Sequence, residues 1–283
     1  MGKVRLDRLV HDRGLCESRE KARALIMAGL VLVDGVRSDK PGTAVKESSE
    51  ITLVQAMRYV SRGGYKLEKA LDTFSLNVEG VTAMDVGAST GGFTDCLLQR
   101  GAARVYSVDV GRGQLAWSLR NDSRVVVLEG QNARYLNRSH TPLPIGFATM
   151  DLSFISALKV VPAVRELLSP GARLVLLVKP QFEAGKALVG KKGIVSDPAV
   201  HRGVLVDVCR GIVRLGFDLI GLTVSPIKGQ KGNVEFLAAF SLTVLNSAED
   251  LANEEQHRTD SETGERLIER VEECVNEASR IHS

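Results

Sequence analysis

A glycine-rich segment between two apolar segments constrains the fold of this chain more than any other feature. Residues 81–84 have the composition of a buried strand, the segment DVGASTGGFTD follows at 85–95, and a helix is expected to begin near residue 93. Glycines allow a tight turn between strand and helix, and they let a ligand approach the free N–H groups at the helix start. The next apolar run ends at Asp109, a carboxylate suited to ribose hydroxyls. The pattern therefore predicts a nucleoside cofactor site.

The spacing of this loop favours one class of nucleoside cofactor over another. A dinucleotide site shows G-x-G-x-x-G around a pyrophosphate, whereas here Gly87 is followed by Gly91 and Gly92. The loop opens with Asp85, an acid that is badly placed for a phosphate but suits a cationic ligand with an amino-acid end. We therefore expect S-adenosylmethionine. The alternative is an ordinary glycine-rich turn with no ligand, and the position of Asp109 argues against it.

From residue 81 onward, apolar strands alternate with helices. Strands are expected at 81–86, 104–109, 124–128, 146–151, 172–179, 218–225 and 233–242, and helices at 66–73, 92–100, 114–119, 156–167 and 198–215. This alternation predicts an α/β fold with a mostly parallel, doubly wound, Rossmann-like sheet. We expect the last hairpin to add an antiparallel edge to it.

Charged residues stand where several of these strands are expected to end, and ligands of such sheets bind beyond the carboxyl ends of the strands. Taken singly, each charge could simply lie on an exposed rim. Glu235, however, falls inside the apolar segment 233–242, where an unpaired acid is costly. We expect two lysines and two acids to converge on one pocket: Lys66, Asp151, Lys179 and Glu235.

Such a pocket could transfer a proton. A ribose hydroxyl is a poor nucleophile until it is deprotonated, and a lysine serves as the base only if desolvation or a neighbouring cation lowers its pKa. We expect Lys66 to be that cation for Lys179. Asp151 and Glu235 would position the ammonium groups and the hydroxyl oxygen.

Residues 3–53 form a second, smaller module. Two short helices are expected at 5–13 and 18–28, with Ser18 as an N-cap and Gly29 as a stop signal, before strands at 30–33 and 49–54. Basic residues crowd the helical pair: Arg5, Arg8, Arg13, Arg19, Lys21 and Arg23. A solvated helix surface explains them as well as a binding face does.

The residues of this module resemble the S4 RNA-binding domain. The resemblance rests on RLD at 5–7, SREKA at 18–22, VDG at 33–35 and KPG at 40–42, and it covers most of residues 4–53. It implies binding of structured RNA by shape and charge. The implied contacts are Arg5, Arg8, Arg19, Lys21, Arg23 and Lys40.

The rest of the chain, to about residue 242, resembles the FtsJ-like 2′-O-ribose methyltransferases and, with the S4 module, the TlyA (hemolysin A) family of bacterial rRNA methyltransferases. The motifs that match are VSRGGYKL at 60–67, DVGASTGGFTD at 85–95, DLSFIS at 151–156, VKPQFE at 178–183 and SPIKGQKGNVE at 225–235. The resemblance implies a Lys-Asp-Lys-Glu tetrad of Lys66, Asp151, Lys179 and Glu235, with Lys179 as the base. It also implies S-adenosylmethionine contacts from Asp85, Gly87, Ser89, Gly91 and Asp109, with Asn132 near the adenine, and ribosomal RNA, with cytidine as the nucleotide, as the substrate.

Composition limits the remaining possibilities. The chain has no apolar run of the ~20 residues that span a bilayer and no secretory signal, so a cytoplasmic protein without a membrane partner is expected. Its four cysteines are scattered and its five histidines are dispersed, which argues against a metal site and places the histidines at the surface. Residues 246–283 hold eleven acids and four arginines, so they carry −7 while the rest carries +10 of the total +3. A basic body suits a polyanionic partner.

We therefore expect an S4-like domain at 1–55, a linker at 56–65, an FtsJ-like domain at 66–244 and an acidic tail at 245–283. In the tail, apolar residues at helical spacing over 261–281 predict an amphipathic helix, with a disordered appendage as the alternative. The basic loop 186–193 could be an RNA-contacting lid or a solvated loop. A non-catalytic ribosome-assembly factor and, less favoured, a cytolysin are the alternative functions, and a monomer and a homodimer both stay open.

Overall fold

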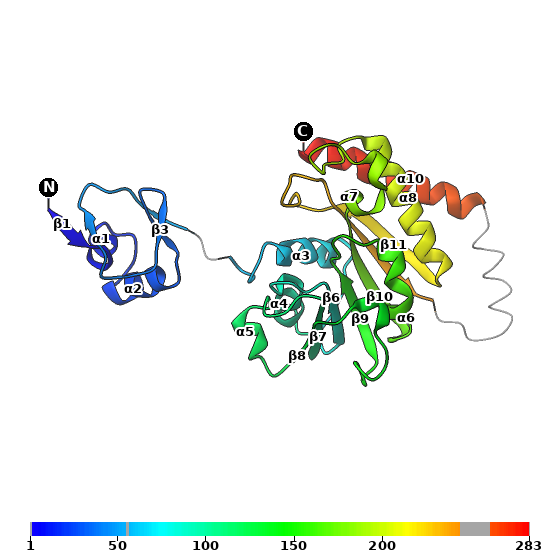
Figure 1. Ribbon diagram of the computed structural model, residues 1–283, viewed down its shortest axis with the longest axis horizontal. Helices are drawn as coiled ribbons and strands as arrows, with labels where there is room; N and C mark the ends of the chain where they lie inside the picture. The colour runs from blue at the N-terminus through cyan, green and yellow to red at the C-terminus, as the bar shows by residue number, and fades with distance from the viewer. Residues whose placement is uncertain (1, 55–56, 244–260, 283) are drawn as a thin grey trace. The chain divides into compact units, whose positions relative to one another are not determined.

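The computed structural model describes residues 2–54, 57–243 and 261–282, and it divides the chain into two compact units, Met1–Arg58 and Tyr59–Ser283 (Figure 1). Each unit has its own hydrophobic core. The division falls near the expected boundary. Residues 59–65, however, which we assigned to a linker, belong to the second unit, because Tyr59 is buried and helix α3 already begins at Gly63.

The first unit combines a helical pair with two small sheets. Its elements are β1 (Lys3–Arg5), α1 (Leu6–Asp12), α2 (Arg19–Met27), β2 (Val31–Val33), β3 (Val36–Ser38), β4 (Ala44–Lys46) and β5 (Ile51–Leu53). The antiparallel sheet has the order β3-β2-β5, and β1 pairs separately with β4. Its core is formed chiefly by Leu6, Leu9, Val10, Ala22, Ile26 and Val31.

The two ends of α2 are set by Ser18 and Gly29, as expected. The Ser18 hydroxyl accepts a hydrogen bond from the Lys21 backbone N–H at 3.1 Å, which caps α2. Gly29 then takes a positive φ of 68°, the left-handed conformation that ends helices.

The second unit is built on a seven-stranded sheet with the order β11-β12-β10-β9-β6-β7-β8. The strands are β6 (Thr82–Val86), β7 (Arg104–Asp109), β8 (Val125–Glu129), β9 (Ile145–Met150), β10 (Leu168–Val178), β11 (Phe217–Val224) and β12 (Phe236–Leu242). The order reverses at β6, whose neighbours β7 and β9 both run parallel to it. This point of reversal is where open α/β sheets bind ligands.

The last hairpin adds an antiparallel edge to the sheet, as expected, with β11 outermost and β12 one strand inside it. β12 pairs antiparallel with β10 on one side and with β11 on the other. Its residues Phe236 to Phe240 are fully buried, and so apolar an edge strand would be a liability. Burial between two neighbours explains the position of β12.

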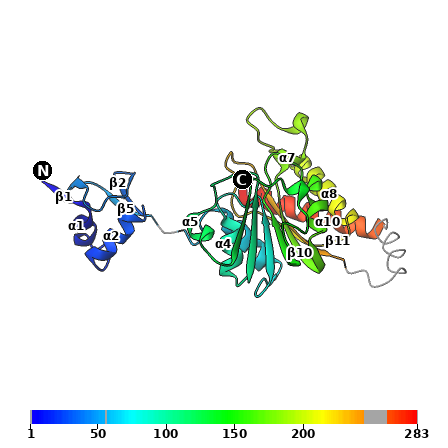
Figure 2. The same cartoon turned by 60° about the horizontal axis from the view of Figure 1, so that its bottom comes forward.

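Helices cover both faces of this sheet (Figures 1 and 2). α3 (Gly63–Thr73) and α4 (Gly92–Gln99) pack on one face, whereas α6 (Val161–Arg165), α8 (Pro198–Arg214) and α10 (Ser261–His282) pack on the other. Alternate residues of β10 point to opposite faces of the sheet. Leu174 and Leu176 pack in the core beneath α6, α8 and α10, whereas Val175 and Leu177 pack in the core beneath α3 and α4.

The helix expected at 156–167 is broken. It splits into the short 3-10 turn η2 (Ala157–Lys159) and α6, and Leu168 already begins β10. Pro162 explains the break, because proline lacks the N–H of a helix interior and is tolerated only in the first turn, where α6 places it. The helix expected at 114–119 is similarly reduced to α5 (Trp117–Arg120).

The carboxyl-terminal segment forms the expected amphipathic helix. In α10, Leu267, Val271, Cys274, Val275 and Ala278 are buried against α8 and β11, while Ile268 stays partly exposed. The first part of the expected tail, to residue 260, lies outside the described residues. Within the part of the chain that the structure describes, no helix is long and apolar enough to cross a membrane.

Candidate active site

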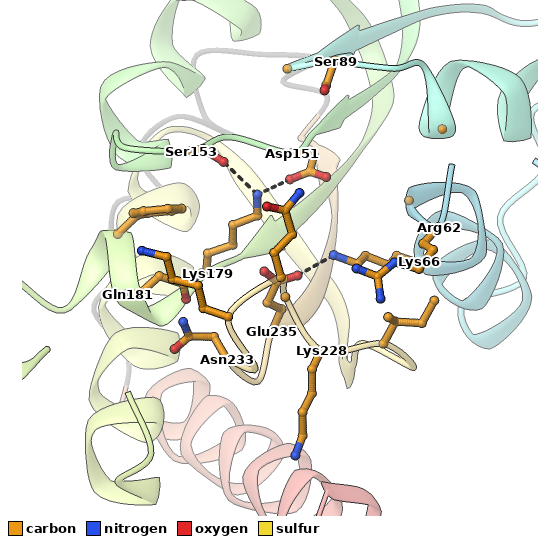
Figure 3. Close-up of a pocket in the computed structure, with 18 of the residues that line it drawn as sticks. Arg62, Lys66, Ser89, Asp151, Ser153, Lys179, Gln181, Lys228, Asn233 and Glu235 are labelled. Carbon is orange, nitrogen blue, oxygen red and sulfur yellow. Dashed lines mark hydrogen bonds and ion pairs between the residues drawn. The ribbon is translucent and has the colours of Figure 1, made fainter. Parts of the chain in front are cut away.

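A cavity of about 600 Å³ opens at the carboxyl edge of the parallel strands (Figure 3). Six of the residues that the sequence singled out line it: Lys66, Gly87, Ser89, Asp151, Lys179 and Glu235. They come from five separate places in the chain, because Gly87 and Ser89 share the glycine loop. The glycine loop and the four charged residues therefore line the same cavity, as the sequence predicted.

Lys179 and Asp151 form the first ion pair of the cavity. Asp151 directly follows β9 and Lys179 directly follows β10, and these two strands are parallel neighbours. Their side chains therefore leave the sheet at the same edge. Lys179 Nζ lies 2.5 Å from Asp151 Oδ1 and donates a hydrogen bond of 3.1 Å to Ser153 Oγ.

Lys66 and Glu235 form the second ion pair, although they are 169 residues apart. Lys66 Nζ, on α3, donates to Glu235 Oε2 at 2.6 Å. We expected Glu235 inside a strand, but it lies one residue before β12. Because β12 runs antiparallel, its first residues lie at the same edge as the last residues of β10, with Phe236 opposite Val178.

Both pairs are shielded from solvent, but to different extents. The side chains of Lys66 and Glu235 are 11% and 3% exposed, and those of Lys179 and Asp151 are 12% and 23% exposed. The two cations and two anions of these pairs balance, and Arg62, Lys228 and Lys231, which also line the cavity, give it a net positive charge. Each ammonium group has three hydrogens, and its contacts with described residues use at most two of them, which leaves capacity for a substrate oxygen.

The glycine loop packs directly against this charged group. Gly87 has φ +86°, and a Cβ there would lie 2.4 Å from the Asp151 carbonyl oxygen. Gly91 has φ +97°, and its Cβ would lie 2.3 Å from Leu119. Both glycines are therefore required by backbone conformation and by packing. Gly91 does not line the cavity.

Asp85 has a different environment from the one we inferred. It is fully buried and does not line the cavity. Its Oδ2 accepts from the backbone N–H and the hydroxyl of Thr94, at 2.9 and 2.7 Å, and its Oδ1 accepts from Thr149 at 3.0 Å. The N-cap of α4 is Gly91, which has no side chain, so Asp85 supplies the missing cap from β6. Burial raises the pKa of Asp85 to about 6.

Asp109 and Asn132 lie outside the cavity lining. The Asp109 carboxylate accepts from the backbone N–H groups of Ser89 and Gly111, each at 2.7 Å, and it stays partly exposed with lone pairs to spare. Asn132 is exposed, and its side chain accepts from the Arg134 N–H. The donor set fits S-adenosylmethionine: a glycine loop lines the cavity, and a half-exposed acid at the second strand end can still accept ribose hydroxyls.

The cavity also contains residues that the sequence did not single out. Phe154 is 90% exposed with a φ of +65°, and its ring contacts that of Phe182, with the centroids 5.0 Å apart. Gln181 lines the cavity with a buried Oε1 that has no partner among the described residues. A positive φ at phenylalanine leaves no sequence signal. The motifs DLSFIS and VKPQFE, which contain these residues, were the available hint.

The basic loop 186–193 borders the cavity. It contains η3 (Lys186–Leu188), and Val189 and Gly193 line the cavity. Asn233, which is 2% exposed, holds this loop: its amide donates to the Gly193 carbonyl and accepts from the Val195 N–H, both at 2.9 Å. The loop is thus tied to the segment that carries Glu235.

In the first unit, all six predicted RNA contacts are exposed: Arg5, Arg8, Arg19, Lys21, Arg23 and Lys40. Arg5 and Arg19 both pair with the buried Asp7, and the hydrogen bond from Arg5 chiefly holds the pKa of that carboxyl below its usual range. Arg8 pairs with Asp12 and Lys21 with Glu17.

Neither a metal site nor a disulfide emerges in the described ranges. No group of three histidine, cysteine or acidic residues there could hold a metal ion, and all four cysteines are free thiols. One histidine is not at the surface as we expected. His201 is buried on α8, and its Nε2 lies 2.9 Å from the Val195 carbonyl oxygen. Burial lowers its pKa.

Comparisons with known proteins agree with this architecture. Residues 59–242 match the FtsJ-like methyltransferase family, and residues 4–51 match the S4 domain. The 16S/23S rRNA (cytidine-2′-O)-methyltransferase TlyA of Mycobacterium tuberculosis is 47% identical over 236 residues, which cover 83% of this chain and 88% of that protein. YqxC of Bacillus subtilis, named "Putative rRNA methyltransferase", is 52% identical over 83% of this chain and 84% of its own length.

A solved structure extends the likeness to nearly the whole chain. The protein named "Putative hemolysin" from Streptococcus thermophilus has a TM-score of 0.70 at 43% identity and covers 99% of this chain and 98% of its own. The fold, the cavity and these matches lead to one assignment. This chain belongs to the FtsJ-like methyltransferase family, an enzyme family that uses S-adenosylmethionine, and it carries an S4 domain in front of the methyltransferase domain.

Proposed function

We propose that this protein transfers a methyl group from S-adenosylmethionine to the ribose 2′-hydroxyl of a cytidine. The cytidine lies in the ribosomal RNA of ribosomal subunits. The observation that carries this proposal is the pair of Lys–carboxylate contacts in one cavity beside the glycine loop. The cytidine and the ribosomal RNA come from the name of the M. tuberculosis relative. The S4 domain supports an RNA substrate.

When bound, S-adenosylmethionine supplies an electrophilic methyl group on a sulfonium. Gly87, Ser89 and Asp109 would contact this cofactor, with Asn132 near the adenine. Asp85 and Gly91 are buried beneath the loop, so we assign them an indirect contribution through the position of the loop and of α4.

Lys179 would act as the base. Its neutral amine would accept the proton of the 2′-hydroxyl, and the oxygen would take up the methyl group in line, with S-adenosylhomocysteine as the leaving group. The proton then resides on Lys179 Nζ as an ammonium, beside Asp151 at 2.5 Å. Lys66, held by Glu235 at 2.6 Å, supplies a fixed positive charge that stabilises the developing alkoxide.

The first unit would bind the RNA backbone. Arg5, Arg8, Arg19, Lys21, Arg23 and Lys40 are exposed cations that can neutralise phosphates. Arg23 and Lys40 have no ion pair with any described residue, so they are free for this contact.

The test is transfer of labelled methyl from S-adenosylmethionine to purified small and large ribosomal subunits. Wild type is compared with Lys179→Met, which keeps the length of the side chain and removes the amine. We expect incorporation by wild type only, recovered as 2′-O-methylcytidine after digestion to nucleosides. No incorporation on either subunit, with RNA binding intact, would instead indicate a non-catalytic assembly factor.

A further inference from the structure

Ser153 contacts Lys179 in the cavity, and the proposed reaction does not use this contact. It lies two residues after Asp151 and lines the cavity, with an exposed side chain. Its Oγ accepts a hydrogen bond of 3.1 Å from Lys179 Nζ (Figure 3). Lys179 is therefore held from two sides, by an anion and by a neutral hydroxyl.

We propose that Ser153 is a positioning residue, which fixes the direction in which the Lys179 amine faces the substrate hydroxyl. This inference rests on the proposed function of Lys179 as the base. The neutral amine that serves as the base carries two hydrogens and one lone pair in tetrahedral directions. With one hydrogen directed to Asp151 and one to Ser153, the direction of the lone pair is determined, and it is the one left for the proton of the substrate hydroxyl.

The backbone beside Ser153 is strained in a way that supports this assignment. Phe154 has a φ of +65°, a conformation that bulky residues rarely adopt. The strain is not offset by burial of its ring, because Phe154 is 90% exposed. Strained residues persist where the surrounding structure requires them, and they cluster at functional sites. The turn at Phe154 aims the preceding residue at Lys179.

Several charged groups share the cavity with Lys179. Asp151 follows β9, and the Lys66–Glu235 pair joins α3 to the start of β12. Arg62, Lys228 and Lys231 also line the cavity, and the Phe182 ring lies 5.9 Å from Lys179 Nζ. A hydroxyl that accepts from the ammonium stabilises its charged form. Loss of Ser153 therefore favours release of the proton at lower pH and at the same time loosens the amine.

The variants are Ser153→Ala, which removes the hydroxyl, and Ser153→Thr, which keeps it. Ser156→Ala is the matched control, because Ser156 lies in the same segment but bonds to the Leu158 N–H instead. In Ser153→Ala we expect kcat to fall about tenfold, the loss expected for one hydrogen bond to a charged group, with the KM for S-adenosylmethionine unchanged. Its kcat profile should also rise at a lower pH, by roughly half a unit. Ser153→Thr should restore both values, and the control should change neither.

A second measurement does not depend on methyl transfer. Limited acetylation by acetic anhydride at a series of pH values, followed by peptide mass spectrometry of the full chain, reports the free amine at Lys179. Lys159, an exposed lysine of η2, is the internal reference. The midpoint for Lys179 should move to lower pH in Ser153→Ala only. An unchanged midpoint in Ser153→Ala overturns the inference whether or not methyl transfer is found. If the midpoint moves but ribosomal subunits are not methylated, the proposed function fails and the contact stands.

Discussion

The two lysine–carboxylate pairs of the cavity look alike in the sequence but differ in the structure. Glu235 is 3% exposed, and a Cβ on Gly229 would lie 2.5 Å from its Oε1, so that end of the pair is enclosed. Asp151 is 23% exposed, and its partner Lys179 also contacts Ser153 in the open cavity. In the enclosed pair, each charge depends on the other for its stabilisation. In the open pair, a substrate can replace one of the contacts of Lys179.

The largest effect should follow from a change in the open pair. In Lys179→Met the base is lost, and we expect methyl transfer to ribosomal subunits to fall about 10³-fold, within the range of general-base catalysis. Calorimetric binding of S-adenosylmethionine should stay within about threefold, since the residue is not part of the glycine loop. A variant that keeps a tenth of the activity would remove Lys179 from the role of base.

The enclosed pair should control stability more than the open pair does. Glu235→Gln leaves the Lys66 ammonium buried without an anion, and we expect the free energy of unfolding to fall by about 4 kcal/mol. Asp151→Asn should cost less, about 2 kcal/mol, because the carboxylate of that pair is more exposed. Differential scanning calorimetry measures both.

The double variant Lys66→Met/Glu235→Leu is the control for this difference. It removes both charges, and we expect it to be more stable than Glu235→Gln alone, because apolar groups of similar volume replace a buried pair at little cost. Equal losses from Glu235→Gln and Asp151→Asn would show that burial does not distinguish the two pairs.

Asp85 offers a sharper contrast, since it is a buried acid at the same edge with hydroxyl partners in place of a lysine. Burial raises its pKa from 3.8 to about 6. The folded protein therefore holds this proton more tightly than the unfolded chain, so wild type loses stability as the pH rises from about 4 to about 6. Asp85→Asn has no such proton. The free energy of unfolding of the variant relative to wild type should rise over that window by up to about 3 kcal/mol and stay level above it.

Urea unfolding at a series of pH values checks this prediction, and only the slope with pH is decisive. A flat difference between pH 4 and pH 7 would mean that Asp85 titrates as an ordinary carboxyl. Because the amide can still accept from the Thr94 N–H, Asp85→Asn should keep α4 capped.

Gly87 links the glycine loop to the open pair, and its substitution should give a smaller effect. In Gly87→Ala the added methyl would lie 2.4 Å from the Asp151 carbonyl oxygen, so the backbone that carries this acid must shift. Gly113→Ala is the matched control, with a φ of +71° and nothing within 4 Å. We expect the control to lose about 1 kcal/mol of stability and Gly87→Ala about 2 kcal/mol.

Binding of S-adenosylmethionine separates these two glycine variants further. It should weaken about tenfold in Gly87→Ala and stay unchanged in Gly113→Ala, because only the first glycine lines the cavity. Equal binding in both variants would show that the loop tolerates a displaced Asp151.

Several features could be predicted from the sequence because they depend on local chemistry. Ser18 and Gly29 fix the ends of α2, and the apolar spacing over 261–281 sets the buried face of α10. The strand-end positions of Asp151 and Lys179 follow from apolar runs that stop at a charge. Parallel strands share a carboxyl edge, so these residues had to meet once the sheet was parallel.

Other features depended on neighbours that are distant in sequence. The surroundings of Asp85 could not be predicted because its partners, Thr94 and Thr149, reach it from α4 and β9, and no local pattern reveals such a buried network. The order of the two strands in the last hairpin, with β12 inside β11, could not be predicted because an apolar strand has the same composition in either place. The strain at Phe154 likewise leaves no mark on composition.

The sequence by itself determined the kind of chemistry, because residue types and strand ends decide which groups can reach the carboxyl edge of a parallel sheet. Only the tertiary structure decided the partner of each group and its burial. Lys66 finds Glu235 through an antiparallel strand, Lys179 finds Ser153 through a strained turn, and Asp85 turns away from the cavity. The energy of a charge depends on the atoms around it, and those atoms are assembled from the whole chain.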